Sequence, residues 1–405
     1  VLKMPTTPVL TAILASYIAV VISTDVRLIA VNPEKFEGDK LQASLEESLA
    51  LSSTKILLAP PMASAWVGYF DMDLVDWFPA MHYAFVQLNS EVDVYRMMEE
   101  KNFTGPSLPT ATYHPREVAR YIGYPSEQAI TGFVNHLSGY WTRYYKSEDG
   151  VEASFWIVEQ LETWAGGQDF VDIQLVHHAD FPQPSIIARL NPPEDSPFAG
   201  EIVILGCHFD SINSQNTSAA APGADDNASG TAALLEVYRS LVTHGFRPAE
   251  RTIEFHFYAG EEEGLLGSME IAQAYREADK NVVAMLQYDC IGYAYKQEVL
   301  NTIRLVYNQV SVELSDYVKL LIDTYTTMAS IPFVCPWPCS DYYSYYVYNY
   351  KSTFTLEPKQ NFVTHTAKDV PDKVDMGWVQ RMSRLAISYI VELAYALPPT
   401  ISEEA

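Results

Sequence analysis

The sequence is poor in basic residues. Its 405 residues include 26 lysines and arginines against 51 aspartates and glutamates, which gives a formal net charge of −25. A surface with this balance repels nucleic acid and anionic membranes, and no cluster of basic residues offers either of them a patch. We therefore expect neither nucleic acid nor a membrane surface as a partner.

Long apolar runs are also lacking, with one exception near the N-terminus. The run VLTAILASYIAVVI at 9–22 is too short for an ordinary transmembrane helix. Lys3 precedes it and Ser23 follows it, an arrangement typical of a secretory signal peptide that is cleaved after Ser23. We predict that residues 1–23 are a signal peptide and that the protein is secreted; a buried strand or helix is the alternative for this run.

The sequence has only 4 cysteines. A zinc ribbon needs two close pairs, whereas only Cys335 and Cys339 are close to each other, so that kind of metal site is excluded. In a secreted chain this pair predicts a local disulfide. Cys207 and Cys290 are expected to be buried thiols rather than metal ligands.

The chain divides near residue 110. Residues 24–110 carry no cluster of potential ligands and end in the linker-like segment 105–109, so we predict a propeptide or a small N-terminal lobe there. Residues 111–400 alternate strand and helix patterns, which predicts a mostly parallel central sheet with helices on both faces. The expected strands are 170–177, 185–190, 201–207, 252–258, 282–288, 302–307 and 352–356. The expected helices are 126–137, 151–164, 227 to a stop at 245, 264–278, 311–328 and 376–397, and the tyrosine-rich segment 341–350 is expected to be a helix packed on the sheet.

Candidate metal ligands stand at the carboxyl ends of several expected strands, where open α/β sheets bind their ligands. Imidazole and carboxylate both suit zinc, and two zinc ions about 3.5–4 Å apart need a carboxylate between them. Both imidazoles are then expected to lie within roughly a nanometre of each other. On spacing alone, helix N-terminal charges or solvated acidic faces remain an alternative. The candidates are His208, Asp210, Asp225, Asp226, Glu261, Glu262, Asp289 and, in a late loop, His365.

Six short motifs occur together and in one order. They are HFDS at 208–211, PGADDNASG at 222–230, YAGEE at 258–262, GLLGS at 264–268, QYD at 287–289 and THT at 364–366. Together they resemble the M28 family of dizinc aminopeptidases, and most of all its secreted leucine-aminopeptidase branch from bacteria and fungi. The likeness runs from about residue 115 to 397. It implies a phosphorylase/hydrolase-like zinc-exopeptidase fold and a cofactor of two Zn²⁺ ions.

The resemblance also implies roles for the candidate residues. One zinc would be held by His208 and Asp289, and the other by Glu262 and His365. Asp225 would bridge the two ions, and the peptide bond between Asp225 and Asp226 would be cis. Glu261 would be the general acid/base, and Asp210 would orient the imidazole of His208. The disulfide of the family matches Cys335 and Cys339.

The resemblance further implies a substrate pocket. An apolar pocket lined by Cys290, Trp337, Phe354, Leu356 and Phe362 would suit Leu, Met or Phe at the amino terminus of a peptide or protein substrate. Phe354 and Leu356 would be equally well explained as strand core. Carboxylates near the metals would hold the free α-amino group.

Together these observations predict a secreted metalloaminopeptidase. A glutaminyl cyclase-like enzyme with one zinc, a carboxypeptidase and a non-catalytic scaffold are the alternatives, and self-assembly of the chain stays open. Asn102 and Asn216 are expected glycosylation sites. Asn227 also matches the sequence pattern, but it lies inside the expected metal loop and is predicted to be unmodified.

Overall fold

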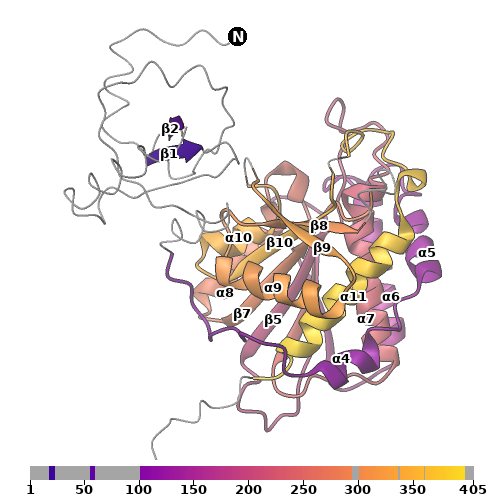
Figure 1. The fold of residues 1–405 in the computed structure, drawn as a ribbon. Coiled ribbons are helices and arrows are strands. Elements are labelled where there is room, and N and C mark those ends of the chain that lie inside the picture. The colour runs from indigo at the N-terminus through magenta and orange to yellow at the C-terminus, as the bar shows by residue number, and fades with distance from the viewer. Residues whose placement is uncertain are drawn as a thin grey trace, which may run out of the picture.

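The computed structural model describes residues 101–293, 301–335, 338–359 and 361–396 (Figure 1). It also gives the backbone of two short strands, β1 (Ile18–Ile22) and β2 (Lys55–Ala59), which pair antiparallel. The rest of the expected signal peptide and of the region 24–100 lies outside the described residues. Within the described part, no helix is both long enough and apolar enough to cross a membrane.

An eight-stranded sheet forms the centre of the molecule, in the order β3-β4-β6-β5-β7-β10-β8-β9. Its inner strands β6, β5, β7 and β10 run parallel, as predicted, and β8 and β9 also pair parallel. The pairs β3–β4, β4–β6 and β10–β8 are antiparallel, so the sheet is mixed. The strands span Val171–Val176 (β3), Ser185–Leu190 (β4), Glu201–His208 (β5), Thr252–Tyr258 (β6), Asn281–Tyr288 (β7), Thr302–Val306 (β8), Ala329–Phe333 (β9) and Ser352–Leu356 (β10).

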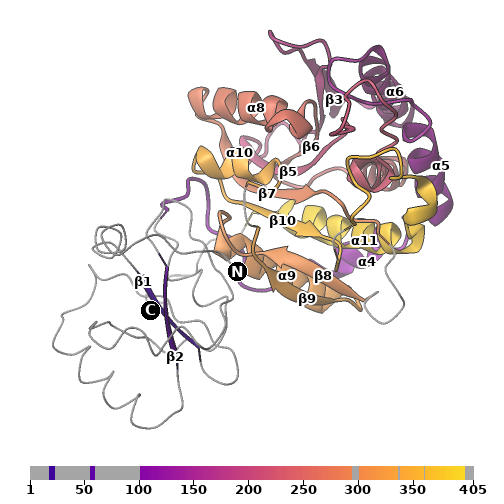
Figure 2. The same ribbon diagram turned by 90° about the horizontal axis from the view of Figure 1, so that it is seen from above.

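Helices cover both faces of the sheet, which confirms the predicted α/β fold (Figure 2). α8 (Leu266–Glu277) and α10 (Tyr342–Val347) lie on one face. The other face is covered by α6 (Glu148–Ala165), α7 (Gly230–Thr243), α9 (Val312–Tyr325) and α11 (Met376–Leu393), with α4 (Pro115–Tyr121) and α5 (Glu127–Leu137) packed against them. The short segments η4 (Ala224–Ser229), η5 (Glu261–Glu263) and η6 (Pro371–Lys373) complete the order.

Local sequence signals set several helix starts. The side chains of Ser126, Ser147 and Ser311 accept hydrogen bonds from backbone amides of the first turns of α5, α6 and α9. Asp375 does the same for α11. Each cap satisfies an amide that has no partner within its own helix, which explains why the predicted starts agree with the structure to within a few residues.

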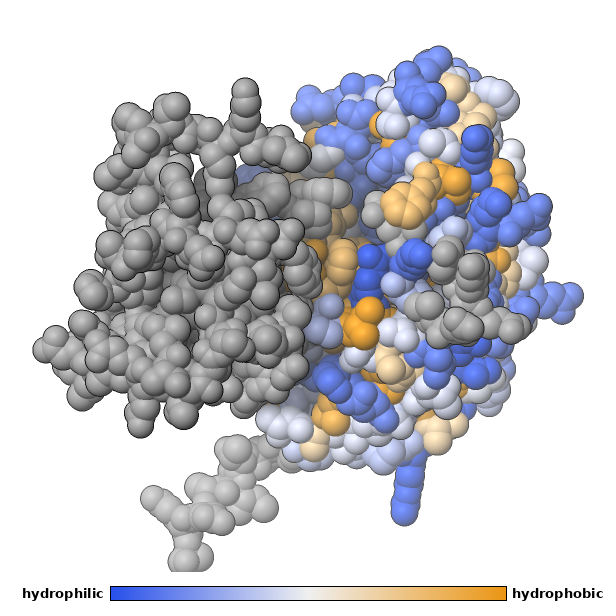
Figure 3. Space-filling model, turned by 45° about the horizontal axis from the view of Figure 1, so that its top comes forward, coloured by the Kyte–Doolittle hydropathy of each residue, from blue (hydrophilic) through white to orange (hydrophobic). Residues whose placement is uncertain are grey.

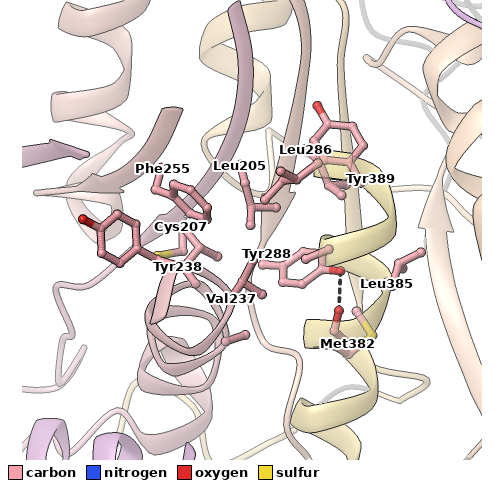
Figure 4. Packing of buried hydrophobic residues seen from close by; sticks show 14 of the residues in the cluster. Leu205, Cys207, Val237, Tyr238, Phe255, Leu286, Tyr288, Met382, Leu385 and Tyr389 are labelled. Carbon is pink, nitrogen blue, oxygen red and sulfur yellow. Dashed lines mark hydrogen bonds between the residues drawn. The ribbon is translucent and has the colours of Figure 1, made fainter. Parts of the chain in front are cut away.

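The main core lies between the inner strands and the helices α7 and α11 (Figure 4). Tyr288 from β7 is fully buried there, and its hydroxyl donates to the carbonyl oxygen of Met382 at 2.8 Å. Cys207 is a free, buried thiol in the same core, as predicted. A second apolar cluster fills the other face and includes Tyr342 and Tyr345 of α10, which confirms that the tyrosine-rich segment packs on the sheet.

The segment expected to be a linker packs on the domain. The amide of Thr104 donates to the carbonyl oxygen of Asn349 at 2.8 Å, and Lys351 Nζ donates to that of Pro106 at 2.6 Å. Leu108 is buried. The domain surface in Figure 3 is mostly hydrophilic with scattered hydrophobic residues, as expected for a chain rich in acidic side chains.

Candidate metal centre

The first group of converging side chains comes from adjacent parallel strands. His208 is the last residue of β5, and Asp289 directly follows β7. His208 Nε2 lies 3.4 Å from Asp289 Oδ1 and 3.2 Å from Asp226 Oδ1. These three residues place one ligand atom each within 4.8 Å of one another, close enough to hold one ion. The strand order therefore brings together residues that lie far apart in sequence.

A second group lies on the other side of Asp226. His365 Nε2 is 3.0 Å from Asp226 Oδ2 and 3.0 Å from Glu262 Oε2, and these three residues also meet the spacing of a metal site. One carboxylate thus faces both imidazoles, each with a different oxygen. The two rings consequently lie within the nanometre that the sequence predicted.

The residue between the two groups is Asp226, so the prediction for Asp225 is wrong. Asp225 Oδ1 accepts a hydrogen bond from the amide of Gly292, and its Oδ2 accepts one from Asn361 Nδ2, both at 2.9 Å. Because both carboxylate oxygens of Asp225 accept these hydrogen bonds, Asp225 stabilises the loop rather than facing the two imidazoles. The cis peptide bond is likewise one residue later than expected, between Asp226 and Asn227.

Glu261 and Asp210 both lie beside His208. Glu261 Oε2 is 3.9 Å from His208 Nε2 but belongs to neither group, which leaves its carboxyl free to exchange a proton. Asp210 Oδ1 is 3.4 Å from His208 Nδ1, and the Asp210 carboxylate accepts the backbone amides of Glu261 at 3.1 Å and Glu262 at 3.2 Å. Asp210 therefore links the orientation of the imidazole to the position of both glutamates.

The metal loop has two buried anchors that the sequence did not reveal. Arg143 is fully buried and donates to the carbonyl oxygens of Leu137, Phe209, Pro222 and Gly223. Asp369 accepts the backbone amides of Asp225 and Asp226 at 3.0 Å each. Neither anchor stands at a strand end, so no positional signal distinguishes it from any other arginine or aspartate.

The protonation of the cluster reflects crowding of like charges. Burial and the charge of Asp226 raise the pKa of Glu262 to about 8, and burial raises the pKa of Glu261 well above its usual range. Hydrogen bonds to Asp226 and Glu262 raise the pKa of His365 to about 12. Burial opposes a charge on His208, yet the surrounding carboxylates, Asp289 first, raise its pKa.

The donor set fits a pair of zinc ions. Nε2 of His208, Oε1 of Glu262 and Oδ1 of Asp289 are buried and have no hydrogen-bond partner. Buried polar atoms without partners are costly, and here they converge with carboxylates that repel one another. Two divalent cations with nitrogen and oxygen ligands would satisfy these atoms and offset the repulsion.

A cavity of about 630 Å³ opens beside both groups. Cys290, Phe354 and Leu356 line it, as predicted, and Cys290 is a partly exposed free thiol rather than a buried one. Phe362 is 79% exposed and does not line the cavity, so its assignment was wrong: its side chain points to solvent. Trp337 lies outside the described residues. Lining residues that the sequence did not indicate include Leu265, Met269, Arg304, Phe333, Tyr343 and Glu357.

The covalent modifications can be placed on this structure. Cys335 and Cys339 form a disulfide at the wall of the cavity, as predicted. Asn102 and Asn216 are exposed, so glycosylation of both remains a prediction that the structure accommodates. Asn227 is fully buried, in keeping with the expectation that it carries no glycan.

Comparisons with known proteins agree with this geometry. Residues 185–390 match the model of peptidase family M28. The "Probable leucine aminopeptidase" of Arthroderma otae is 34% identical over 296 residues, covering 72% of this chain and 80% of the relative. "Leucine aminopeptidase 1" of Coccidioides posadasii is 33% identical over 306 residues, with 72% and 77% covered. The crystal structure of the Legionella pneumophila LapA aminopeptidase superposes with a TM-score of 0.66 at 25% identity, covering 75% of this chain and 80% of that one.

A mixed α/β sheet with two imidazole–carboxylate groups at the carboxyl ends of its parallel strands defines a hydrolytic metalloenzyme. The chain belongs to peptidase family M28 and is a peptide-bond hydrolase.

Proposed function

We propose that this protein is a secreted aminopeptidase that uses two zinc ions to remove bulky apolar residues, such as Leu, from the amino termini of peptides and proteins. The observation that carries the proposal is the carboxylate of Asp226, whose two oxygens face His208 and His365 at 3.2 Å and 3.0 Å. A single carboxylate shared in this way is what two ions at bridging distance require. The names of the fungal relatives support aminopeptidase activity and the choice of leucine.

Each residue of the site has a task in this reaction. When bound, the two zinc ions would polarise the scissile carbonyl and activate water. Glu261, which belongs to neither ligand group, takes the proton of the attacking water and returns it to the leaving amine. Asp210 fixes the His208 imidazole through Nδ1. The apolar walls formed by Phe354 and Leu356 receive the first side chain of the substrate.

Replacing Glu261 by Gln tests the assignment of the proton-transfer group. The amide is isosteric but does not accept a proton, so kcat for a leucine chromogenic amide should fall at least about a hundredfold. Because Glu261 belongs to neither ligand group, the variant should still hold about two zinc ions per chain, measured by elemental analysis. Wild-type turnover with zinc retained would remove Glu261 from the mechanism.

Zinc content and substrate tests on the wild-type protein distinguish the proposed aminopeptidase from the alternative functions. One zinc ion per chain in the active wild-type protein would favour a glutaminyl cyclase-like enzyme. Cleavage of peptides whose amino terminus is acetylated would favour a carboxypeptidase, because an aminopeptidase requires the free amine. A protein that binds two zinc ions but cleaves no peptide would favour the non-catalytic scaffold.

Secretion remains part of the proposal. It is supported by the apolar run at 9–22, by the disulfide between Cys335 and Cys339 and by the exposure of Asn102 and Asn216. The mass of the protein recovered from the medium would show the mature terminus and any glycans. Retention of the chain inside the expressing cells with residues 1–23 in place would contradict export.

A further inference from the structure

The substrate cavity carries a cationic side chain for which the proposed reaction has no use. Arg304 on β8 is the only lysine or arginine among the described residues that line the cavity. The chain as a whole has a net charge of −25, and the cavity borders a cluster of carboxylates. A guanidinium placed in such a cavity attracts an anionic group of a ligand.

Strand register places Arg304 in line with the metal centre. Tyr288, which precedes Asp289, pairs with Thr355 of β10. The next residue of β10, Leu356, pairs with Arg304 of β8. One strand therefore separates Asp289 from Arg304, and their backbones lie roughly 10 Å apart across the sheet. A metal ligand, an apolar side chain and a guanidinium thus follow one another along the cavity.

The contacts of Arg304 hold its side chain in place at Nε and leave its two terminal amino groups available to bind a ligand. Its Nε donates to the carbonyl oxygen of Glu357 at 2.5 Å, and its Cζ lies 4.4 Å from the ring centre of Phe333. The carboxylate of Glu357 lies near enough to attract the guanidinium but forms no salt bridge with it, and its two oxygens accept the amides of Tyr293 and Asn361. In the part of the chain that the structure describes, no carboxylate forms a salt bridge with Arg304, and its two terminal amino groups have no acceptor.

We infer that Arg304 gives the cavity a second specificity, for peptides that begin with glutamate. This inference rests on the proposed aminopeptidase function. The methylene groups of the glutamate side chain pack on Leu356, and its carboxylate accepts two hydrogen bonds from the planar guanidinium, a geometry that arginine favours. Glutamate fits better than aspartate, because β10 separates Arg304 from the strand that ends at Asp289, and a longer substrate side chain spans this distance better.

A structural role for Arg304 makes a different prediction. If the guanidinium only balances the acidic groups around it, its removal should lower turnover of every substrate by the same factor. If it binds the substrate carboxylate, removal should affect glutamate alone. The ratio of kcat/KM for glutamate to kcat/KM for its neutral isostere glutamine therefore distinguishes the two roles.

The experiment uses the full chain loaded with zinc and three chromogenic amides, of Leu, Glu and Gln. In Arg304→Gln, the Glu:Gln ratio of kcat/KM should fall about tenfold or more, mainly through KM, while Leu changes little. Arg304→Lys keeps the charge and should retain part of the ratio. The matched control is Arg247→Gln, since Arg247 also lies over an aromatic ring and donates to backbone carbonyls but stands outside the cavity.

The outcomes separate the inference from the function on which it rests. An unchanged Glu:Gln ratio in Arg304→Gln overturns the inference while leaving leucine cleavage intact. Failure of the zinc-loaded wild type to cleave any amide overturns the proposed function instead. The thermal transition of Arg304→Gln shows whether this variant folds. If it does not, competition with the wild-type enzyme provides the test: L-glutamate should inhibit leucine-amide cleavage at a lower concentration than L-glutamine. Equal inhibition by the two amino acids contradicts the inference.

Discussion

At the scale of single residues, the difference between Asp225 and Asp226 shows what hydrogen bonding contributes to the site. Both side chains are buried in one loop, and both would suit a cation by type. The amide of Gly292 and the side chain of Asn361 take the oxygens of Asp225, whereas those of Asp226 face two imidazoles. Sequence places two adjacent aspartates in the loop, but only the backbone path shows which of them points into the site.

Substituting each aspartate by asparagine separates the two roles. Asp226→Asn should lower bound zinc from about two ions per chain to about one or fewer, because a neutral amide does not offset the repulsion between two cations. Asp225→Asn, the matched control, should keep both ions and lose only some thermal stability. Elemental analysis after dialysis measures the zinc content. The opposite result, with zinc lost from Asp225→Asn and kept in Asp226→Asn, would restore the bridging role to Asp225.

At the scale of elements, the metal loop is held by the anchors around it rather than by its own regularity. The segment η4 contains two residues outside helical geometry, Asp226 and Asn227, so its shape needs outside support. Arg143 binds the carbonyls of Pro222 and Gly223 just before this segment, and Asp369 binds the amides of Asp225 and Asp226 within it. The loop is thus fixed on both sides of its backbone.

Arg143→Lys tests this support. An ammonium group has fewer donors than a guanidinium and does not span four carbonyl oxygens, so buried acceptors lose their partners. We expect the free energy of unfolding to fall by about 3 kcal/mol or more, together with weaker zinc binding. Denaturant unfolding measures the first effect and zinc titration the second. Arg120→Lys on the exposed side of α4 is the control, and equal stability of the two variants would show that Arg143 does not anchor the loop.

Elements with strong local signals were predictable. The strands at 185–190, 252–258 and 352–356 agree with the structure because short apolar runs with clear ends have few alternatives. The edge strand β9 was missed: its exposed residues and Pro332 show no strand pattern, and it forms by pairing with β8. The short helix α4 was missed as well, since it packs mainly against α11 rather than showing a long apolar face of its own.

At the scale of the whole molecule, the sequence predicted where ligands converge better than what surrounds them. His208 and Asp289 meet because parallel strands end at one edge, a rule that needs only the strand assignment. The cavity wall is built from residues on several strands and loops, and its composition depends on which strands are neighbours. Arg304 illustrates this: it enters the cavity because β8 pairs with β10, an order that sequence periodicity does not reveal.

The charge balance of the centre determines how stability depends on pH once zinc is removed. Asp341 is fully buried, and its carboxylate accepts a hydrogen bond from Gln287 Nε2 at 2.8 Å. Burial raises the pKa of Asp369 to about 8 and that of Asp341 to about 7, and hydrogen bonds to Asp226 and Glu262 raise the pKa of His365 to about 12. All three groups bind protons more tightly in the folded chain than in the unfolded one, so the folded state carries extra protons from about pH 4 upward. Their contribution to stability is present at low pH and is lost as the pH rises through the folded values. Burial acts to raise the pKa of Asp226, but its two histidine partners lower it overall. The stability that this carboxylate contributes is therefore lost only as the pH falls below about 4.

The chelator-treated protein should therefore melt at a lower temperature at pH 9 than at pH 6. Of these groups only His365 belongs to the proposed ligand set, and zinc would replace the proton on its imidazole. Zinc binding strengthens as the ligands deprotonate, so the gain in Tm on adding zinc should be larger at pH 9 than at pH 6. Thermal unfolding of metal-free and zinc-loaded samples at both pH values measures the two differences, and Mg²⁺, which prefers oxygen ligands, serves as the control cation and should raise Tm less than zinc. A metal-free chain that is equally or more stable at pH 9 would mean that crowded carboxyls and imidazoles do not hold these extra protons, and the electrostatic argument for a pair of cations would then lose its basis.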